Sequence, residues 1–117
     1  VISPIGAGGK GEAFNINADY VASAIASALK AEKLILLTDV PGIKNKRGDI
    51  ISSVNKEGIK KLIDAGTVSG GMLPKVQACT RAIDAGVKKT HIVDGRVPHC
   101  LLLEIFTKEG IGTEIVG

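Results

Sequence analysis

Aromatic residues are scarce in this chain, which has no tryptophan, one tyrosine and two phenylalanines among 117 residues. Proteins that bind single-stranded nucleic acid usually stack the bases on exposed aromatic rings. The formal net charge is also small, +3 at pH 7, whereas nucleic-acid-binding domains normally carry a strong basic patch. We therefore expect no nucleic-acid partner.

Long apolar runs and clustered cysteines are missing as well. Charges or glycines interrupt the apolar stretches well before the roughly 20 residues of a membrane-spanning helix, so we expect no membrane partner. Cys79 and Cys100 lie far apart in the sequence, and no metal site is predicted from them. Cys79 falls on the apolar side of a helical pattern and is interpreted as a buried thiol. This cysteine usage favours a reducing compartment such as the cytoplasm.

Glycine and aliphatic residues are abundant instead, with 15 glycines and 44% hydrophobic residues. This composition is typical of α/β proteins, in which helices pack closely on a buried parallel sheet. The length suits a single domain, residues 1–117. Because the chain opens on Val1 within a strand-like segment, we expect it to be a fragment of a longer protein.

Strand-like and helix-like segments alternate along the chain. The alternation predicts an α/β fold, a three-layer sandwich with a mostly parallel central sheet covered by helices. The segment Leu34–Leu37 is apolar throughout, which predicts a strand covered on both faces. Strands are expected at 1–5 (buried), 12–15, 33–38, 90–93 and 113–116, and helices at 18–30, 55–66, 72–86 and 98–106. The apolar faces expected of the first and last helices are Val21, Ile25, Ala28 and Leu29, and Leu101, Leu102, Ile105 and Phe106.

Two polar clusters stand at predicted helix starts, Asn15–Asp19 and Ser69–Lys75. Lys75 lies in a first turn, where the helix dipole disfavours a cation unless an anion is bound nearby. It follows a double glycine whose backbone can approach a phosphate. If the two helix starts face each other, they form a phosphate-handling site. Ordinary roles remain open at this point, because Asp19 also suits a first helical turn and lysines are usually solvated.

Three motifs in order, Asn15–Asp19, Leu34–Ile43 and Gly70–Val76, resemble the amino acid kinase family. The resemblance covers essentially the whole chain and corresponds to the carboxyl-terminal, nucleotide-binding half of the family. It implies an α/β sandwich that uses ATP with Mg²⁺. The implied reaction is phosphorylation of the γ-carboxylate of N-acetyl-L-glutamate to an acyl phosphate in arginine biosynthesis. The amino-terminal half of the family has no counterpart here, so we expect the isolated chain to be inactive.

The resemblance also implies roles for individual residues. Lys75 would stabilise the transferring phosphoryl group, Asp19 would organise the catalytic lysines, and Asn15, with Asn17 beside it, would bind the acyl substrate. The residues implied in nucleotide binding are Thr38, Asp39, Val40, Gly42, Ile43, Lys44, Thr67, Val68, Ser69, Gly71 and Met72.

The last third of the chain resembles the arginine-inhibited branch of the family. Lys33, Glu104 and Gly112 match positions that contact the inhibitor L-arginine there. That branch implies a hexamer at full length. The likeness to plastid and cyanobacterial members implies a plastid stroma as a second possible location and the PII signalling protein as a partner. Two alternatives stay open: another amino acid kinase acting on carbamate, aspartate or UMP, or a non-catalytic module that senses arginine or PII.

Overall fold

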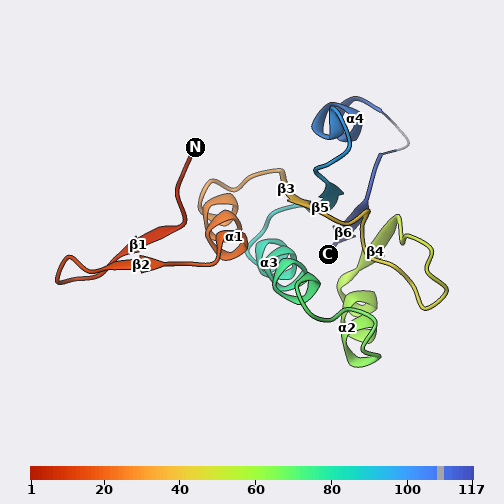
Figure 1. Cartoon of the computed structure of the whole chain (residues 1–117), viewed down its shortest axis with the longest axis horizontal. Coiled ribbons are helices and arrows are strands. Elements are labelled where there is room, and N and C mark those ends of the chain that lie inside the picture. The colour runs from red at the N-terminus through yellow and green to blue at the C-terminus, as the bar shows by residue number, and fades with distance from the viewer. Residues whose placement is uncertain (108–109) are drawn as a thin grey trace.

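The computed structural model describes residues 1–107 and 110–117, in which ten helices and strands are found (Figure 1). They are β1 (Ile5–Ala7), β2 (Ala13–Asn15), α1 (Ala18–Ala28), β3 (Lys33–Thr38), β4 (Ser53–Asn55), α2 (Lys56–Asp64), α3 (Met72–Asp84), β5 (Lys89–Asp94), α4 (Cys100–Phe106) and β6 (Thr113–Val116). No helix in this part of the chain has both the length and the hydrophobicity needed to cross a bilayer.

The central sheet has four strands in the order β3-β5-β6-β4. β3 pairs parallel with β5, and β4 pairs parallel with β6. The two halves join through an antiparallel pair, β5 with β6. The predicted mostly parallel sheet is therefore confirmed, with one antiparallel junction in its middle.

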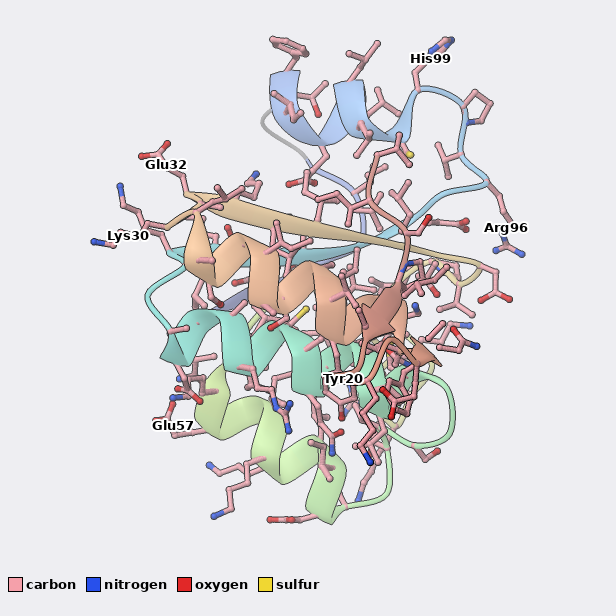
Figure 2. All side chains as sticks on the ribbon, turned by 90° about the vertical axis from the view of Figure 1, so that its left-hand side faces the viewer. Tyr20, Lys30, Glu32, Glu57, Arg96 and His99 are labelled. Atoms are coloured by element: carbon pink, nitrogen blue, oxygen red, sulfur yellow. The ribbon has the colours of Figure 1, made fainter. Side chains whose placement is uncertain are left out.

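Helices cover the sheet on two sides (Figure 2). The helices α1, α3 and α2 lie on one side and α4 lies on the other, which confirms the three-layer arrangement. The core lies between the sheet and α3, where Val76, Cys79, Ile92 and Ile115 are fully buried. Burial raises the pKa of the Cys79 thiol to about 11, so this cysteine is the inert core residue that was predicted.

Local capping fixes where two of the helices begin. The Asn17 side-chain oxygen accepts hydrogen bonds from the backbone N–H groups of Asp19, at 2.9 Å, and Tyr20, at 3.4 Å. Asn55 accepts in the same way from Gly58 N–H at 2.9 Å. Such side chains satisfy amide groups that have no partner within the helix, so α1 and α2 start where the sequence predicts.

The predicted buried strand at residues 1–5 is wrong. Val1 and Ile2 are exposed, and the strand that forms, β1, pairs only with β2 in a separate antiparallel hairpin. Figure 1 shows this hairpin extending away from the central sheet. A two-stranded hairpin has no second layer to cover its apolar side chains, which explains their exposure.

The predicted apolar face of α4 is also wrong, and that of α1 is correct only in part. In α1 Val21 and Ile25 are half-buried, but Ala28 is exposed and Leu29 caps the helix end and is 75% exposed. The residues that are fully buried there are Ser23 and Ala26. In α4 the buried residues are Cys100 and Glu104. The four residues expected to be buried there are exposed: Leu101, Leu102, Ile105 and Phe106. The small residues Ser23 and Ala26 let α1 approach its neighbours closely. α4 turns Glu104 toward the sheet because Lys33 and His91 lie there as its charged and polar partners.

Two further differences concern the sheet. Leu37 on β3 is 48% exposed, so this strand is fully covered only on the face that carries Leu34 and Leu36. The reason is that α4 is the only described helix on the other face, and it is short. Strand β4 was not predicted, because Ser53-Val54-Asn55 is too short and polar to give a strand pattern.

Candidate functional site

The starts of α1 and α3 lie side by side and are joined by an ion pair. The Nζ of Lys75 lies 3.2 Å from both carboxylate oxygens of Asp19. The two side chains are 22% and 18% exposed, respectively. The contact explains how a cation can occupy the first turn of α3, since Asp19 offsets the unfavourable helix dipole. The two polar helix starts do face each other, as their chemistry required.

The two asparagines before Asp19 have different surroundings. Asn17 uses its side-chain oxygen to cap α1. Asn15 is the last residue of β2 and is exposed. Both are therefore held on the segment that leads into Asp19, but only Asn17 has a structural role within the described contacts.

A cavity of about 250 Å³ lies beside the start of α3. Two segments distant in sequence form most of its wall, 40–44 after β3 and 67–69 before α3. Its lining is Val40, Pro41, Gly42, Ile43, Lys44, Thr67, Val68, Ser69 and Met72. We call it the loop cavity. It brings together eight of the eleven residues implied in nucleotide binding, while Thr38, Asp39 and Gly71 are chain neighbours of its lining and do not line it.

The loop cavity and the ion pair share one helix start. Met72 lines the cavity, and Lys75 follows it three residues later on α3. Residues three apart in a helix lie on the same side. A group bound in the loop cavity and extending along that side would therefore approach the Lys75 ammonium. Pro41 was not singled out from the sequence, although the motif around it was.

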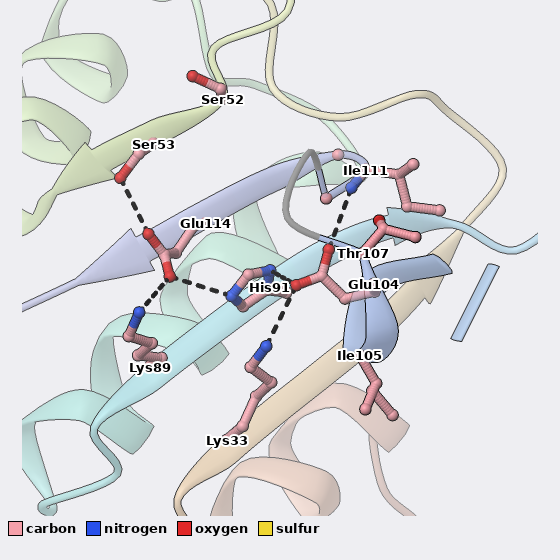
Figure 3. A pocket seen from close by; sticks show the side chains of 12 residues that line it. Lys33, Ser52, Ser53, Lys89, His91, Glu104, Ile105, Thr107, Ile111 and Glu114 are labelled. Carbon is pink, nitrogen blue, oxygen red and sulfur yellow. Dashed lines mark hydrogen bonds and ion pairs between the residues drawn. The ribbon is translucent and has the colours of Figure 1, made fainter. Parts of the chain in front are cut away.

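A second cavity, of about 470 Å³, lies on the other side of the sheet under α4 (Figure 3). It contains all three residues that the sequence associated with arginine: Lys33, Glu104 and Gly112. The Glu104 carboxylate is nearly buried, and its Oε1 lies 3.2 Å from Lys33 Nζ. The backbone N–H of Ile111 donates to Glu104 Oε2 at 3.1 Å. We call this space the charged cavity.

A second carboxylate lies across the charged cavity. Glu114 accepts from Lys89 Nζ at 2.9 Å and from Ser53 Oγ at 3.3 Å. The hydrogen bond from Lys89 lowers the pKa of Glu114. His91 lies between the carboxylates, with Nδ1 2.5 Å from Glu104 and Nε2 3.3 Å from Glu114. His91 was not among the site residues expected from the sequence, although it lines this cavity.

Burial lowers the pKa of His91, and the nearby carboxylates of Glu104 and Glu114 oppose this shift. Its buried Nε2 forms no hydrogen bond with the described residues, although a Glu114 oxygen lies 3.3 Å away. A buried polar atom of this kind normally has a partner in a protein or its ligand. No sequence signal could have found this, because His91, Glu104 and Glu114 come from three different elements.

A profile of the amino acid kinase family matches residues 1–94. The chain belongs to the amino acid kinase family. Its fold agrees with this assignment, and so does the arrangement of the family motifs at the starts of α1 and α3.

Individual members of the family are similar over nearly the whole chain. The acetylglutamate kinase of Persephonella marina is 61% identical over 116 residues, which are 99% of this chain and 39% of the relative. The acetylglutamate kinase of Geotalea uraniireducens is 62% identical over 117 residues, which are 100% of this chain and 40% of the relative. The chain thus spans about two-fifths of the length of these curated relatives. Both relatives are bacterial, so they give no support to a plastid form, and the cyanobacterial type stays a prediction.

A solved structure shares the fold. It is N-acetylglutamate synthase from Neisseria gonorrhoeae, complexed with coenzyme A and L-arginine, with a TM-score of 0.90 and 30% sequence identity. The match covers 98% of this chain and 27% of that protein. An amino acid kinase fold therefore occurs in proteins named for more than one reaction.

Proposed function

We propose that this chain is the ATP-binding part of an enzyme that phosphorylates the γ-carboxylate of N-acetyl-L-glutamate. The observation that carries the proposal is the Asp19–Lys75 ion pair at the start of α3, the helix whose first residue, Met72, lines the loop cavity. The relatives named acetylglutamate kinase support this substrate over carbamate, aspartate or UMP. The reaction would belong to arginine biosynthesis.

The transfer itself requires position and charge more than covalent chemistry. A carboxylate oxygen of the substrate attacks the γ-phosphorus of ATP and forms a new P–O bond. The bond from that phosphorus to the β,γ-bridging oxygen breaks, and ADP leaves with the electron pair. Lys75 would neutralise charge on the transferring group, and Asp19 would hold the ammonium in place. Asn15 would bind the acyl substrate, with Asn17 fixing the segment that carries it.

Mg²⁺ fits the donor set as a companion of the nucleotide. In residues 1–107 and 110–117, no three acidic, histidine or cysteine side chains are close enough to hold a metal ion. Asp39 precedes the lining residue Val40 in the chain and would supply a carboxylate there. One carboxylate plus substrate phosphates is a usual setting for Mg²⁺. The ion would offset phosphate charge during the transfer.

The test is an assay of the protein expressed from its complete gene. ATP and N-acetyl-L-glutamate are supplied with hydroxylamine, which converts an acyl phosphate to a coloured hydroxamate. We expect hydroxamate with N-acetyl-L-glutamate and none with carbamate, aspartate or UMP replacing it. Phosphoryl transfer to one of the other acceptors would replace this proposal with another kinase activity. ATP that stays intact with each acceptor would favour a non-catalytic module.

The charged cavity supports a second proposal, that L-arginine binds there and inhibits the enzyme. Two carboxylates, Glu104 and Glu114, suit a guanidinium group, and the buried Nε2 of His91, which forms no hydrogen bond with the described residues, lines the same cavity. The related Neisseria gonorrhoeae synthase was solved with L-arginine bound. Hexamer formation and PII binding would accompany this type of regulation.

Calorimetry tests the arginine site separately from ATP binding. Arginine should bind, and citrulline should not, because its neutral urea group cannot form an ion pair with a carboxylate. Binding of arginine should weaken strongly in Glu104→Gln and remain in Glu12→Gln, a change on the β1–β2 turn far from the cavity. Equal binding of arginine and citrulline would refute a guanidinium site. Binding of arginine without binding of ATP would favour the sensing module.

A further inference from the structure

The loop that forms one wall of the loop cavity is attached to the central sheet by a side chain. Ile43 is 2% exposed, so its backbone groups need partners inside the protein. Its carbonyl accepts from Ile51 N–H at 2.8 Å. Its N–H donates to the side-chain oxygen of Thr113 at 2.9 Å. The second bond joins positions 70 residues apart and is itself buried.

The same loop presses directly on the start of β6. Gly42 has a φ of +147°, a backbone conformation that side chains rarely adopt. A Cβ at this position would lie 2.8 Å from Thr113 Oγ1 and 3.3 Å from the backbone carbon of Gly112. The absence of a side chain at Gly42 is therefore what allows Ile43 N–H to reach the Thr113 hydroxyl.

Thr113 is well placed to act as a fixed anchor. It is fully buried and opens β6, where it pairs with Ile92 on the central strand β5. The charged cavity ends at its neighbours Gly112 and Glu114, but Thr113 does not line either cavity. Its hydroxyl therefore has one evident use, to hold the loop that lines the loop cavity.

We propose that Thr113 is a positioning residue for nucleotide binding, acting through the backbone of Ile43. The inference rests on the proposed function, since it takes the loop cavity as the nucleotide site. The hydrogen bond of Thr113 goes to Ile43, whereas Lys75 and Asp19 bond to each other. Thr113 fixes the position of the loop that carries Ile43, and hence the affinity of the loop cavity for ATP, without taking part in phosphoryl transfer.

The experiment uses Thr113→Val in the protein expressed from its complete gene. Valine keeps the shape of threonine and removes the acceptor, which leaves Ile43 N–H buried without a partner. We expect the KM for ATP to rise about tenfold, the change that one such hydrogen bond typically carries. The KM for N-acetyl-L-glutamate should not change, and Thr113→Ser, which keeps the hydroxyl, should restore the KM for ATP.

The matched control is Thr90→Val. Thr90 is equally buried on the adjacent strand β5, but its hydroxyl faces the carbonyl of Ile115 and not the loop. It should leave the KM for ATP unchanged. An unchanged KM in Thr113→Val, or the same rise in Thr90→Val, would overturn the inference while leaving the proposed function intact. A wild-type protein that fails to bind the ATP analogue AMP-PNP would refute the proposed function itself, and the inference with it.

Discussion

At the scale of single residues, the central question is what Lys75 contributes beyond its contact with Asp19. The pair is part-buried and keeps some contact with solvent, and solvent screening reduces what an ion pair contributes to stability. An ammonium placed at the edge of a cavity matters more for catalysis, where charge develops in the transition state. The pair is therefore better explained by chemistry than by folding.

We predict that Lys75→Ala lowers kcat roughly 10²–10³-fold in the hydroxamate assay, as loss of one electrostatic donor usually does. The free energy of unfolding should hardly change. Lys60→Ala is the control, because Lys60 is an exposed lysine of α2 that lines neither cavity, and its kcat should equal that of the wild type. Near-normal turnover in Lys75→Ala would remove this residue from the mechanism.

His91 gives a prediction about pH. Its pKa is lowered in the folded protein, so the unfolded chain binds the proton more readily. Stability is then fully present above the ordinary histidine pKa of about 6.5 and falls as the pH drops through the window below it. His91→Gln should remove this part of the slope when urea unfolding is compared at several pH values. His99→Gln, at an exposed histidine, should keep the slope, and equal slopes in all three proteins would contradict the assignment.

At the scale of elements, the segment before α1 combines folding and function in adjacent residues. Asn17 caps the helix, whereas Asn15 makes no such contact. We predict that Asn17→Ala lowers the free energy of unfolding by about 1 kcal/mol, measured with urea. Asn15→Ala should leave stability unchanged and raise the KM for N-acetyl-L-glutamate. The reverse assignment, with Asn15 essential for stability, would show that this segment has been misinterpreted.

The elements that could be predicted from sequence are those with local signals. α1 and α2 carry their own capping asparagines, and β3 is an unbroken apolar run. The errors arise where the deciding partner is distant. Glu104 on α4 is buried because Lys33 on β3 and His91 on β5 lie beside its carboxylate. These contacts turn α4 so that its apolar residues face solvent.

The candidate site divides in the same way. The Asp19–Lys75 pair and most of the loop cavity could be predicted because ordered motifs carried them. His91 and Glu114 in the charged cavity, and Thr113 behind the loop, could not be predicted. Each of these residues contacts a residue outside its own element, and periodicity within one segment holds no information about such contacts.

At the scale of the whole molecule, the loop cavity forms within this chain, although the chain spans about two-fifths of its relatives' length. We therefore expect the 117-residue chain to bind nucleotide without catalysing phosphoryl transfer. We predict that the 117-residue chain binds AMP-PNP, measured by calorimetry, but forms no hydroxamate. The protein expressed from its complete gene should do both.

Two glycine variants make this prediction specific to the loop cavity. Gly42 and Gly48 both have positive φ angles, +147° and +91°, so alanine strains the backbone at either position. Gly42 belongs to the wall of the loop cavity, and a Cβ there would meet other atoms, whereas nothing lies within 4 Å of a Cβ at Gly48. Gly42→Ala should thus abolish AMP-PNP binding and Gly48→Ala should retain it. Hydroxamate formation by the 117-residue chain, or equal loss of binding in both variants, would contradict this division between binding and turnover.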